Sequence, residues 1–130
     1  MEPSGDEGGY HLAIEEHAGY LHARATGPRT PENARRFLKE AGEACLRAGK
    51  SSLLVEMNFS GPMLDRSAIF NVISDRAPDG LKLRRIAYVD ASATDPGGPA
   101  FATIVASNRG VNVRLFGDVA SARAWLEVVE

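Results

Sequence analysis

The sequence predicts an α/β fold: a mixed, mostly parallel sheet with an N-terminal antiparallel hairpin, in the order β-β-α-β-α-β-α-β-α. Two observations carry this prediction. After an opening pair of strands, helix and strand patterns alternate with short connections, an order that produces right-handed crossovers and parallel pairing. The segment from Ala100 to Glu130 then contains a helix, a stop, a strand, a cap and a helix, with glycine or aspartate at the joints.

The composition is that of one globular domain. The chain has 130 residues, of which 44% are hydrophobic and 25% are charged, enough to build one substantial core. We expect a single domain over residues 10–130. Residues 1–9 are acidic and glycine-rich and lack the features of a signal peptide, so we expect them to form a disordered leader.

Charge and hydropathy argue against two classes of partner. The net charge is −2 and no basic stripe is visible, which disfavours a nucleic-acid partner. No apolar run approaches the roughly 20 residues that a helix needs to span a membrane. We therefore expect no membrane insertion and a cytoplasmic location.

The first two strands are predicted over Tyr10–His17 and Tyr20–Gly27, around a two-residue turn. Pairing around this turn places Glu15 opposite His22 and sorts the side chains onto two faces. The apolar face consists of Leu12, Ile14, Leu21, Ala23 and Ala25. The polar face consists of His11, Glu15, His17, Tyr20, His22 and Arg24.

The first helix is predicted to begin after Thr30, whose hydroxyl can cap it, with Pro31 at its first position. Its apolar residues recur at helical spacing as far as Gly49, which ends it. A strand of the buried type follows over Ser52–Met57. The next segment, Asn58–Leu64, is predicted to be a loop.

The second half of the chain continues the alternation. A helix is predicted to open at Asp65 and to end near Ala77-Pro78. The elements after it are a strand over Leu83–Asp90, a loop over Ala91–Pro99, a helix over Ala100–Asn108, a strand over Val111–Phe116 and a helix after Asp118.

No motif indicates a reaction or a cofactor. Neither of the phosphate-binding patterns, GxGxxG and GxxxxGK[ST], occurs, which disfavours the nucleotide-binding classes that depend on them. Cys45 lies in the apolar row of the first helix, so we interpret it as a core residue rather than a nucleophile. As the single cysteine, it forms no internal disulfide.

Three residues of the hairpin have the chemistry of a metal site. In the predicted register Glu15, His17 and His22 share one strand face, and imidazole with carboxylate suits zinc. A real site also needs ligands that are fixed by outer partners. Polar residues on the solvent side of an edge hairpin are the commoner outcome, so we predict no metal.

Polar residues follow the predicted parallel strands, at the carboxyl ends where open α/β sheets bind ligands. They are Glu56, Asn58, Ser60, Asp90 and Ser92. Glu56 and Asp90 could serve as an acid/base pair, or they could cap neighbouring loops and helix starts. We assign no catalytic residue, and a hydrolase-type enzyme is the third hypothesis.

The C-terminal run Asn108–Asp118, continuing into Ala122–Leu126, resembles the ending of the bacterial SpoIIAA-like/STAS-like proteins. The resemblance extends to the hairpin and to Asn58–Gly61, and covers nearly the whole chain after the leader. It implies a STAS and CRAL-TRIO type fold and a non-enzymatic regulatory role. Anti-sigma-factor antagonists of that superfamily bind a partner kinase. They are switched by phosphorylation of a serine at the start of the helix after the third strand.

The same resemblance implies a surface that binds a protein partner. The antagonists carry Asp-Leu-Ser-Gly and then Met-Asp-Ser-Ser, where this chain has Asn-Phe-Ser-Gly at 58–61 and Leu-Asp-Arg-Ser at 64–67. Arg66 takes the place of the phosphorylated serine, and Ser67 matches the serine after it. The expected surface consists of Asn58, Ser60, Gly61, Asp65, Arg66 and Ser67, with Ser67 as the candidate phosphorylation site.

Two other partners fit the predicted elements. The helix faces that carry Ile69, Phe70, Val72, Ile73, Phe101, Ile104 and Val105 either line a cavity for an apolar small molecule or lipid, or fill the core. The unpaired edge of the hairpin invites a second copy of the chain, which gives a homodimer.

Overall fold

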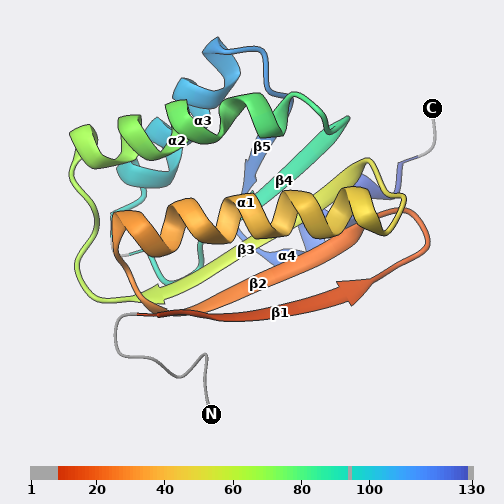
Figure 1. Cartoon of the computed structure of the whole chain (residues 1–130), viewed down its shortest axis with the longest axis horizontal. Helices are drawn as coiled ribbons and strands as arrows, with labels where there is room; N and C mark the ends of the chain where they lie inside the picture. The colour runs from red at the N-terminus through yellow and green to blue at the C-terminus, as the bar shows by residue number, and fades with distance from the viewer. Residues whose placement is uncertain (1–8, 94, 129–130) are drawn as a thin grey trace.

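A computed structural model describes residues 9–93 and 95–128 and contains the predicted elements in the predicted order (Figure 1). The strands are β1 (His11–Glu16), β2 (Leu21–Pro28), β3 (Ser52–Ser60), β4 (Arg85–Val89) and β5 (Val113–Phe116). The helices are α1 (Pro31–Arg47), α2 (Arg66–Gly80), α3 (Gly97–Asn108) and α4 (Val119–Leu126). The expected leader lies outside the described residues, except for Gly9.

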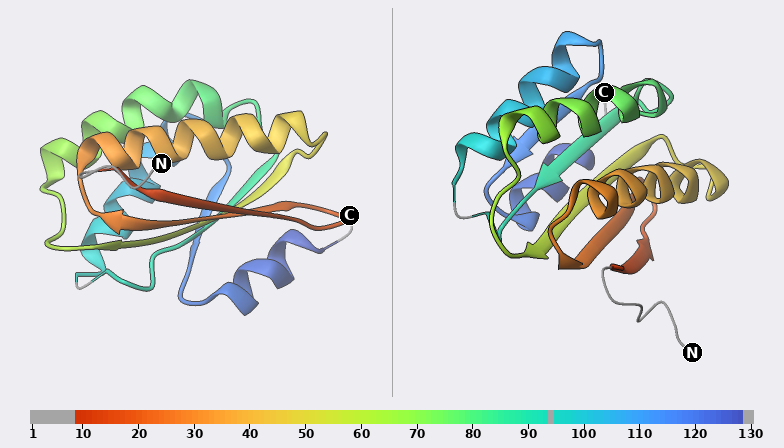
Figure 2. Two further views of the ribbon diagram at one scale, coloured as in Figure 1. Left: turned by 60° about the horizontal axis from the view of Figure 1, so that its bottom comes forward. Right: turned by 60° about the vertical axis from the view of Figure 1, so that its left-hand side comes forward.

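The five strands form one sheet in the order β1-β2-β3-β4-β5. β1 pairs antiparallel with β2, and the other three pairs are parallel, as predicted. The predicted hairpin register is also confirmed, with Glu15 opposite His22. Figure 2 shows α1 and α2 on one side of the sheet and α4 on the other. No helix of the described residues is long and apolar enough to cross a membrane.

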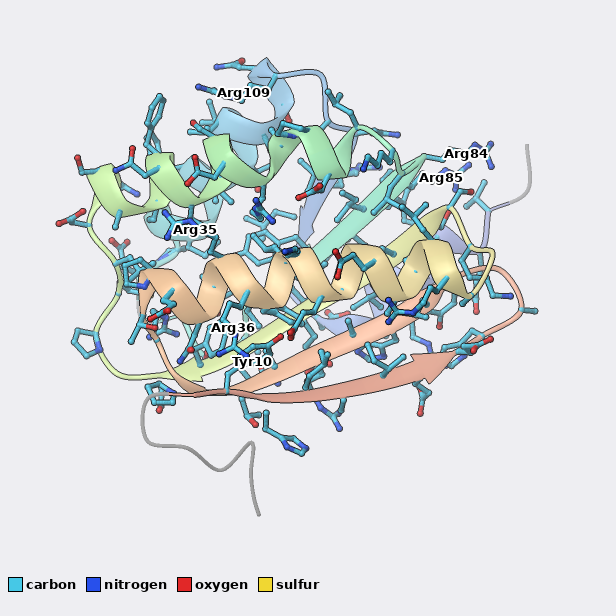
Figure 3. All side chains as sticks on the ribbon, viewed as in Figure 1. Tyr10, Arg35, Arg36, Arg84, Arg85 and Arg109 are labelled. Carbon is cyan, nitrogen blue, oxygen red and sulfur yellow. The ribbon has the colours of Figure 1, made fainter. Side chains whose placement is uncertain are left out.

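The main core lies between the sheet and the helices α1 and α2. Phe37 of α1 and Phe59 of β3 are almost fully buried, and they pack edge to face with each other and with Tyr10, at centroid distances of 5.9 to 6.2 Å. The Tyr10 hydroxyl donates a hydrogen bond to Glu40, and the Arg36 guanidinium lies over its ring (Figure 3). The contacts of Tyr10 therefore join the start of β1 to α1.

The first helix begins and ends as predicted. Thr30 caps it, with Oγ1 accepting a hydrogen bond of 3.0 Å from the backbone N–H of Asn33. Pro31 occupies the first turn, where a missing N–H costs nothing. Gly49 follows the helix with a positive φ of 75°, a conformation that glycine adopts without steric cost.

Besides shifts of one or two residues at the ends of other strands, three predicted boundaries are wrong. The segment predicted as a loop from Asn58 continues β3 as far as Ser60, because the last residues of β2 pair with it. The second helix continues through Pro78 to Gly80, since a proline in the last turn removes a single hydrogen bond. The third helix begins at Gly97, three residues before the expected Ala100.

A second, smaller core lies under α4. Because of it, the burial of two hairpin residues differs from the prediction. Tyr20, predicted on the solvent side, is 1% exposed because α4 covers this part of the sheet. Its hydroxyl accepts a 2.7 Å hydrogen bond from Nε of Arg123. Ile14, predicted on the core side, is 42% exposed because β1 is an edge strand.

Candidate functional site

Most of the residues expected to bind a partner lie at the end of β3, in the connection to α2 and in the first turn of α2. Ser60 and Gly61 lie exposed at the end of β3, and Gly61 has a positive φ of 99°. Asp65 caps α2, with Oδ1 accepting a 2.8 Å hydrogen bond from the backbone N–H of Ala68. Ser67 lies exposed in the first turn of α2.

Arg66 joins the start of α2 to the start of α3. Its Nη1 donates a 2.7 Å hydrogen bond to the carbonyl of Gly97, and its guanidinium lies 5.2 Å from the ring centroid of Phe101. A Cβ at position 97 would approach Nη2 of Arg66 to 2.8 Å, so only glycine fits against this arginine without a shift. The guanidinium is therefore held over an aromatic ring at the molecular surface.

A second arginine on an aromatic ring lies nearby. The Arg109 guanidinium at the end of α3 is 5.0 Å from the ring centroid of Phe70 on α2 (Figure 3). Phe70 is 43% exposed, and Ile104 of α3 is 57% exposed. We call this surface the α2–α3 outer face. It consists of Arg66, Ser67, Phe70, Phe101, Ile104 and Arg109.

Asn58 does not join this surface. Strand alternation turns its side chain to the side of the sheet that carries α4. There its Nδ2 donates a 2.9 Å hydrogen bond to Oε2 of Glu56, whose Oε1 lies 2.7 Å from Nε2 of His22. Asn58 is therefore part of a polar network with the hairpin rather than with the start of α2.

The two strand-end carboxylates considered as an acid/base pair have separate surroundings. Glu56 is bonded to His22 and Asn58 on the α4 side of the sheet. Asp90 accepts hydrogen bonds from the hydroxyls of Tyr88, at 3.0 Å, and Ser92, at 3.3 Å. Burial raises the pKa of Asp90, against the opposing effect of these bonds and of a nearby arginine. Among the described residues the two carboxylates have different hydrogen-bond partners, and they face opposite sides of the sheet, an arrangement unlike an acid/base pair.

Arg29 holds the carboxyl ends of β3 and β4 together. Its Nη2 donates hydrogen bonds to the carbonyl of Phe59, at 2.8 Å, and to Oγ of Ser92, at 3.1 Å. Its Nη1 donates to the carbonyl of Gly61. The same side chain lies beside Asp90. Arg29 therefore fixes the segment that leads into α2, although no sequence motif marked it.

Two adjoining cavities are lined by residues of the sheet and of the helices α1, α2 and α3. Their volumes are about 100 Å³ and about 50 Å³. They share the lining residues Leu38, Met57, Ile73, Tyr88 and Ala102. Of the side chains expected to line a cavity, Ile69, Val72 and Ile73 do so. The others are not among the lining residues: Phe70, Phe101 and Ile104 belong to the α2–α3 outer face, and Val105 is buried away from the cavities.

Cys45 is a core residue, as predicted. It is fully buried in the main cluster, with Sγ 3.4 Å from the carbonyl oxygen of Ser52. Burial raises the pKa of its thiol to about 11. A thiol in this environment remains protonated at neutral pH, which does not suit a nucleophile.

Comparison with solved structures identifies the fold. No family model matches the chain, and no curated protein matches it. A crystal structure of an uncharacterised protein of the DUF3478 family from Shewanella loihica PV-4, described as having a SpoIIAA-like fold, superposes with a TM-score of 0.55. The two sequences are 19% identical, over 91% of this chain and 94% of that one. The chain therefore has a SpoIIAA-like fold, as the resemblance predicted.

Proposed function

We propose that the chain is a non-enzymatic protein-interaction module that binds an acidic partner surface through the α2–α3 outer face. One observation carries the proposal: two exposed arginines, Arg66 and Arg109, lie on aromatic rings of neighbouring helices. Neither forms an ion pair with a carboxylate within the part of the chain that the structure describes.

The apolar part of this face supports the same proposal. Phe70 and Ile104 are large side chains that project from adjacent helices and remain about half exposed. Aromatic residues and arginine are enriched in the centres of protein interfaces, where a few such residues supply most of the binding energy. A partner that covers Phe70 and Ile104 would remove both from water.

The charge of the face indicates the chemistry of the partner. Arg66 and Arg109 have their guanidinium groups anchored by backbone carbonyls, so little side-chain entropy remains to be lost on binding. The chain as a whole carries a net charge of −2, whereas the two arginines make this face locally positive. Carboxylates of a partner would complement them, and such an interaction weakens as salt is added.

Ser67 gives the same surface a candidate switch. It is exposed in the first turn of α2, directly after Arg66. A phosphate there would add about −1.5 to −2 charges at a helix N-terminus and beside the arginine. It would reverse the local charge, and we propose that it would reduce affinity for an acidic partner.

Matched substitutions test the interaction surface. The unmodified chain and three variants, Phe70→Ala, Ile104→Ala and Leu46→Ala, would be used to capture proteins from a lysate of the cells that express it. Leu46, on α1, is a suitable control because it is 43% exposed, as Phe70 is. A partner would then be purified and its affinity measured at two salt concentrations.

We expect one partner, and we expect the Leu46→Ala variant to bind it as well as the unmodified chain does. Phe70→Ala and Ile104→Ala should each weaken the binding of this partner by about 1–2 kcal/mol, or roughly fivefold to thirtyfold in Kd. A partner lost equally with all three variants, or one whose binding is insensitive to salt, would contradict the proposed surface. Turnover of a substrate by the purified chain would contradict the non-enzymatic assignment.

A second candidate function is the binding of an apolar small molecule, and the two adjoining cavities favour it. Their shared lining is apolar except for the Tyr88 hydroxyl, which is occupied by Asp90. Native mass spectrometry of the purified chain should then detect a bound small molecule. Ala102→Val, which adds two methyl groups to the lining of both cavities, should remove it. The absence of any added mass in the unmodified chain would contradict this candidate.

A further inference from the structure

The tip of the β1–β2 hairpin brings three potential metal ligands together on one face of the sheet. Glu15 and His22 are cross-strand partners, and His17 follows Glu15 by two residues on the same face. Oε1 of Glu15 lies 2.7 Å from Nε2 of His17 and 4.0 Å from Nδ1 of His22. One ligand atom from each of the three residues lies within 4.8 Å of the others.

These separations suit a common metal ion. With bonds of about 2.0–2.1 Å, the ligands of a tetrahedral zinc site lie about 3.3 Å from one another. The two observed separations fall on either side of this value, and Glu15, the residue between the histidines, is the most exposed of the three. The three ligand atoms therefore have to shift to bind one ion, and the exposed carboxylate of Glu15 is the group most free to move.

His22 is held by an outer partner, as metal-ligating histidines almost always are. Its Nε2 lies 2.7 Å from Oε1 of Glu56, and their side chains are 12% and 13% exposed. Asn58 in turn donates to the other oxygen of Glu56. With Nε2 engaged in this way, the lone pair of Nδ1 is the one available to a metal, and Nδ1 is the atom nearer to Glu15.

His17 is also fixed in orientation. Its ring stacks on that of Tyr20, with centroids 4.5 Å apart and planes within 9°. Tyr20 is itself buried and bonded to Arg123 of α4. Both imidazoles are therefore held before any ion binds, which lowers the entropic cost of assembling a site.

Against the expectation from the sequence, we propose that Glu15, His17 and His22 bind a zinc ion at the tip of the β1–β2 hairpin. Two imidazoles and one carboxylate are a ligand set that zinc accepts, whereas magnesium and calcium prefer oxygen ligands alone. Three protein ligands leave the fourth tetrahedral position to water or to a group from another molecule. The site lies on the α4 side of the sheet, away from the α2–α3 outer face, so it is independent of the proposed partner surface.

Zinc titration of the full chain tests the proposal. The protein would be prepared without a histidine tag, treated with a chelator, and titrated with zinc chloride in a calorimeter at neutral pH. The variants would be His17→Gln, His22→Gln, Glu15→Gln, Glu56→Gln and His11→Gln. His11 is the remaining histidine of the chain and lies on the same strand, four residues before Glu15, which makes His11→Gln the matched control.

We expect one zinc ion per chain, bound equally well by His11→Gln. Glu56→Gln should weaken binding by about 10–100-fold, as loss of an outer partner does elsewhere. Loss of either histidine should weaken it at least as much. X-ray absorption of the zinc-loaded chain should show nitrogen and oxygen ligands only, including two imidazoles.

Two results would overturn the proposal: no zinc binding by the unmodified chain, or binding that His17→Gln and His22→Gln leave unchanged. If His22→Gln proves unfolded by circular dichroism, His17→Gln decides the question. The side chain of His17 is at the turn, where it contacts Glu15 and Tyr20 and is less tied into the sheet than His22.

Discussion

Arg29 and Asp90 form a buried ion pair: Nη2 of the arginine lies 3.9 Å from Oδ1 of the aspartate, and each side chain is 5% exposed. The arginine comes from the end of β2 and the aspartate from the end of β4, so the pair spans β3 between them. Because Arg29 also donates to the carbonyls of Phe59 and Gly61, the pair holds the segment that leads into α2.

Arg29→Met should be strongly destabilising. It leaves the carboxylate of Asp90 buried without its cation and frees the carbonyls that Arg29 satisfies, a loss of about 3–5 kcal/mol in the free energy of unfolding. Arg35→Met is the matched control. Arg35 and Asp75 are bonded at 3.0 Å but exposed, and such a pair contributes about 0–1 kcal/mol. Urea denaturation measures both.

Asp90→Asn should be less costly than Arg29→Met, because burial already raises the pKa of Asp90 and so disfavours its charged form. In a double-mutant cycle, the two changes together should cost less than the sum of the single changes. Equal losses in Arg29→Met and Arg35→Met would show that burial of the pair contributes nothing.

Cys45 should be unreactive in the folded chain. It is fully buried, and burial raises the pKa of its thiol to about 11, above the ordinary value of about 8.5. A folded-state pKa above the unfolded one gives stability that is complete below about pH 8.5 and is lost as the pH rises towards 11. Cys45→Ala should lack this alkaline loss.

Alkylation with iodoacetamide at pH 8 provides the measurement for Cys45. The modification rate should be negligible in buffer and should rise along the urea unfolding curve. Rapid modification of the native chain would mean that α1 separates locally from the sheet. It would also reopen the assignment of Cys45 as an inert core residue.

The hairpin shows both what the sequence can predict and where it fails. The register around the turn follows from alternation and turn length, so the pairing of Glu15 with His22 was predictable. The burial of Tyr20 was not, because α4, about a hundred residues later, covers it. The hydrogen bond between His22 and the carboxylate of Glu56 depends on how β3 pairs with β2, and no local pattern fixes that register.

The α2–α3 outer face gives a similar lesson. Ile69, Val72 and Ile73 follow the spacing of one helix face, and the structure buries or half-buries all three. Phe70 falls about 160° away from Val72 around the helix, so helical geometry alone places it away from the centre of this face. Its exposure was therefore readable in the sequence. Its contact with Arg109, from a different helix, was not.

The β1 edge should allow a homodimer. Within the described residues β1 pairs on one side alone, with β2, and Ile14 on this strand is 42% exposed. Unpaired backbone groups next to an exposed apolar side chain favour strand pairing between copies. Multi-angle light scattering should give twice the chain mass of 13.9 kDa. Ile14→Lys should return the chain to a monomer, and a monomeric unmodified chain would refute the interface.

Ser67→Glu should stabilise the chain and weaken binding of an acidic partner. A negative charge in the first turn of α2 interacts favourably with the helix dipole, which contributes about 0.3–1 kcal/mol at an exposed site. The control is Ser107→Glu, which places the same charge in the last turn of α3, where the dipole has the opposite sign. Ser107→Glu should therefore lower the melting temperature while Ser67→Glu raises it.

The binding measurement then separates the switch from simple electrostatics. Arg66 immediately precedes Ser67, so the new carboxylate offsets the charge that an acidic partner would contact. Ser67→Glu should reduce affinity at low salt and differ little from the unmodified chain at high salt, where charges are screened. If Ser67→Glu stabilises the helix but leaves affinity unchanged at both salt concentrations, Ser67 lies outside the partner surface.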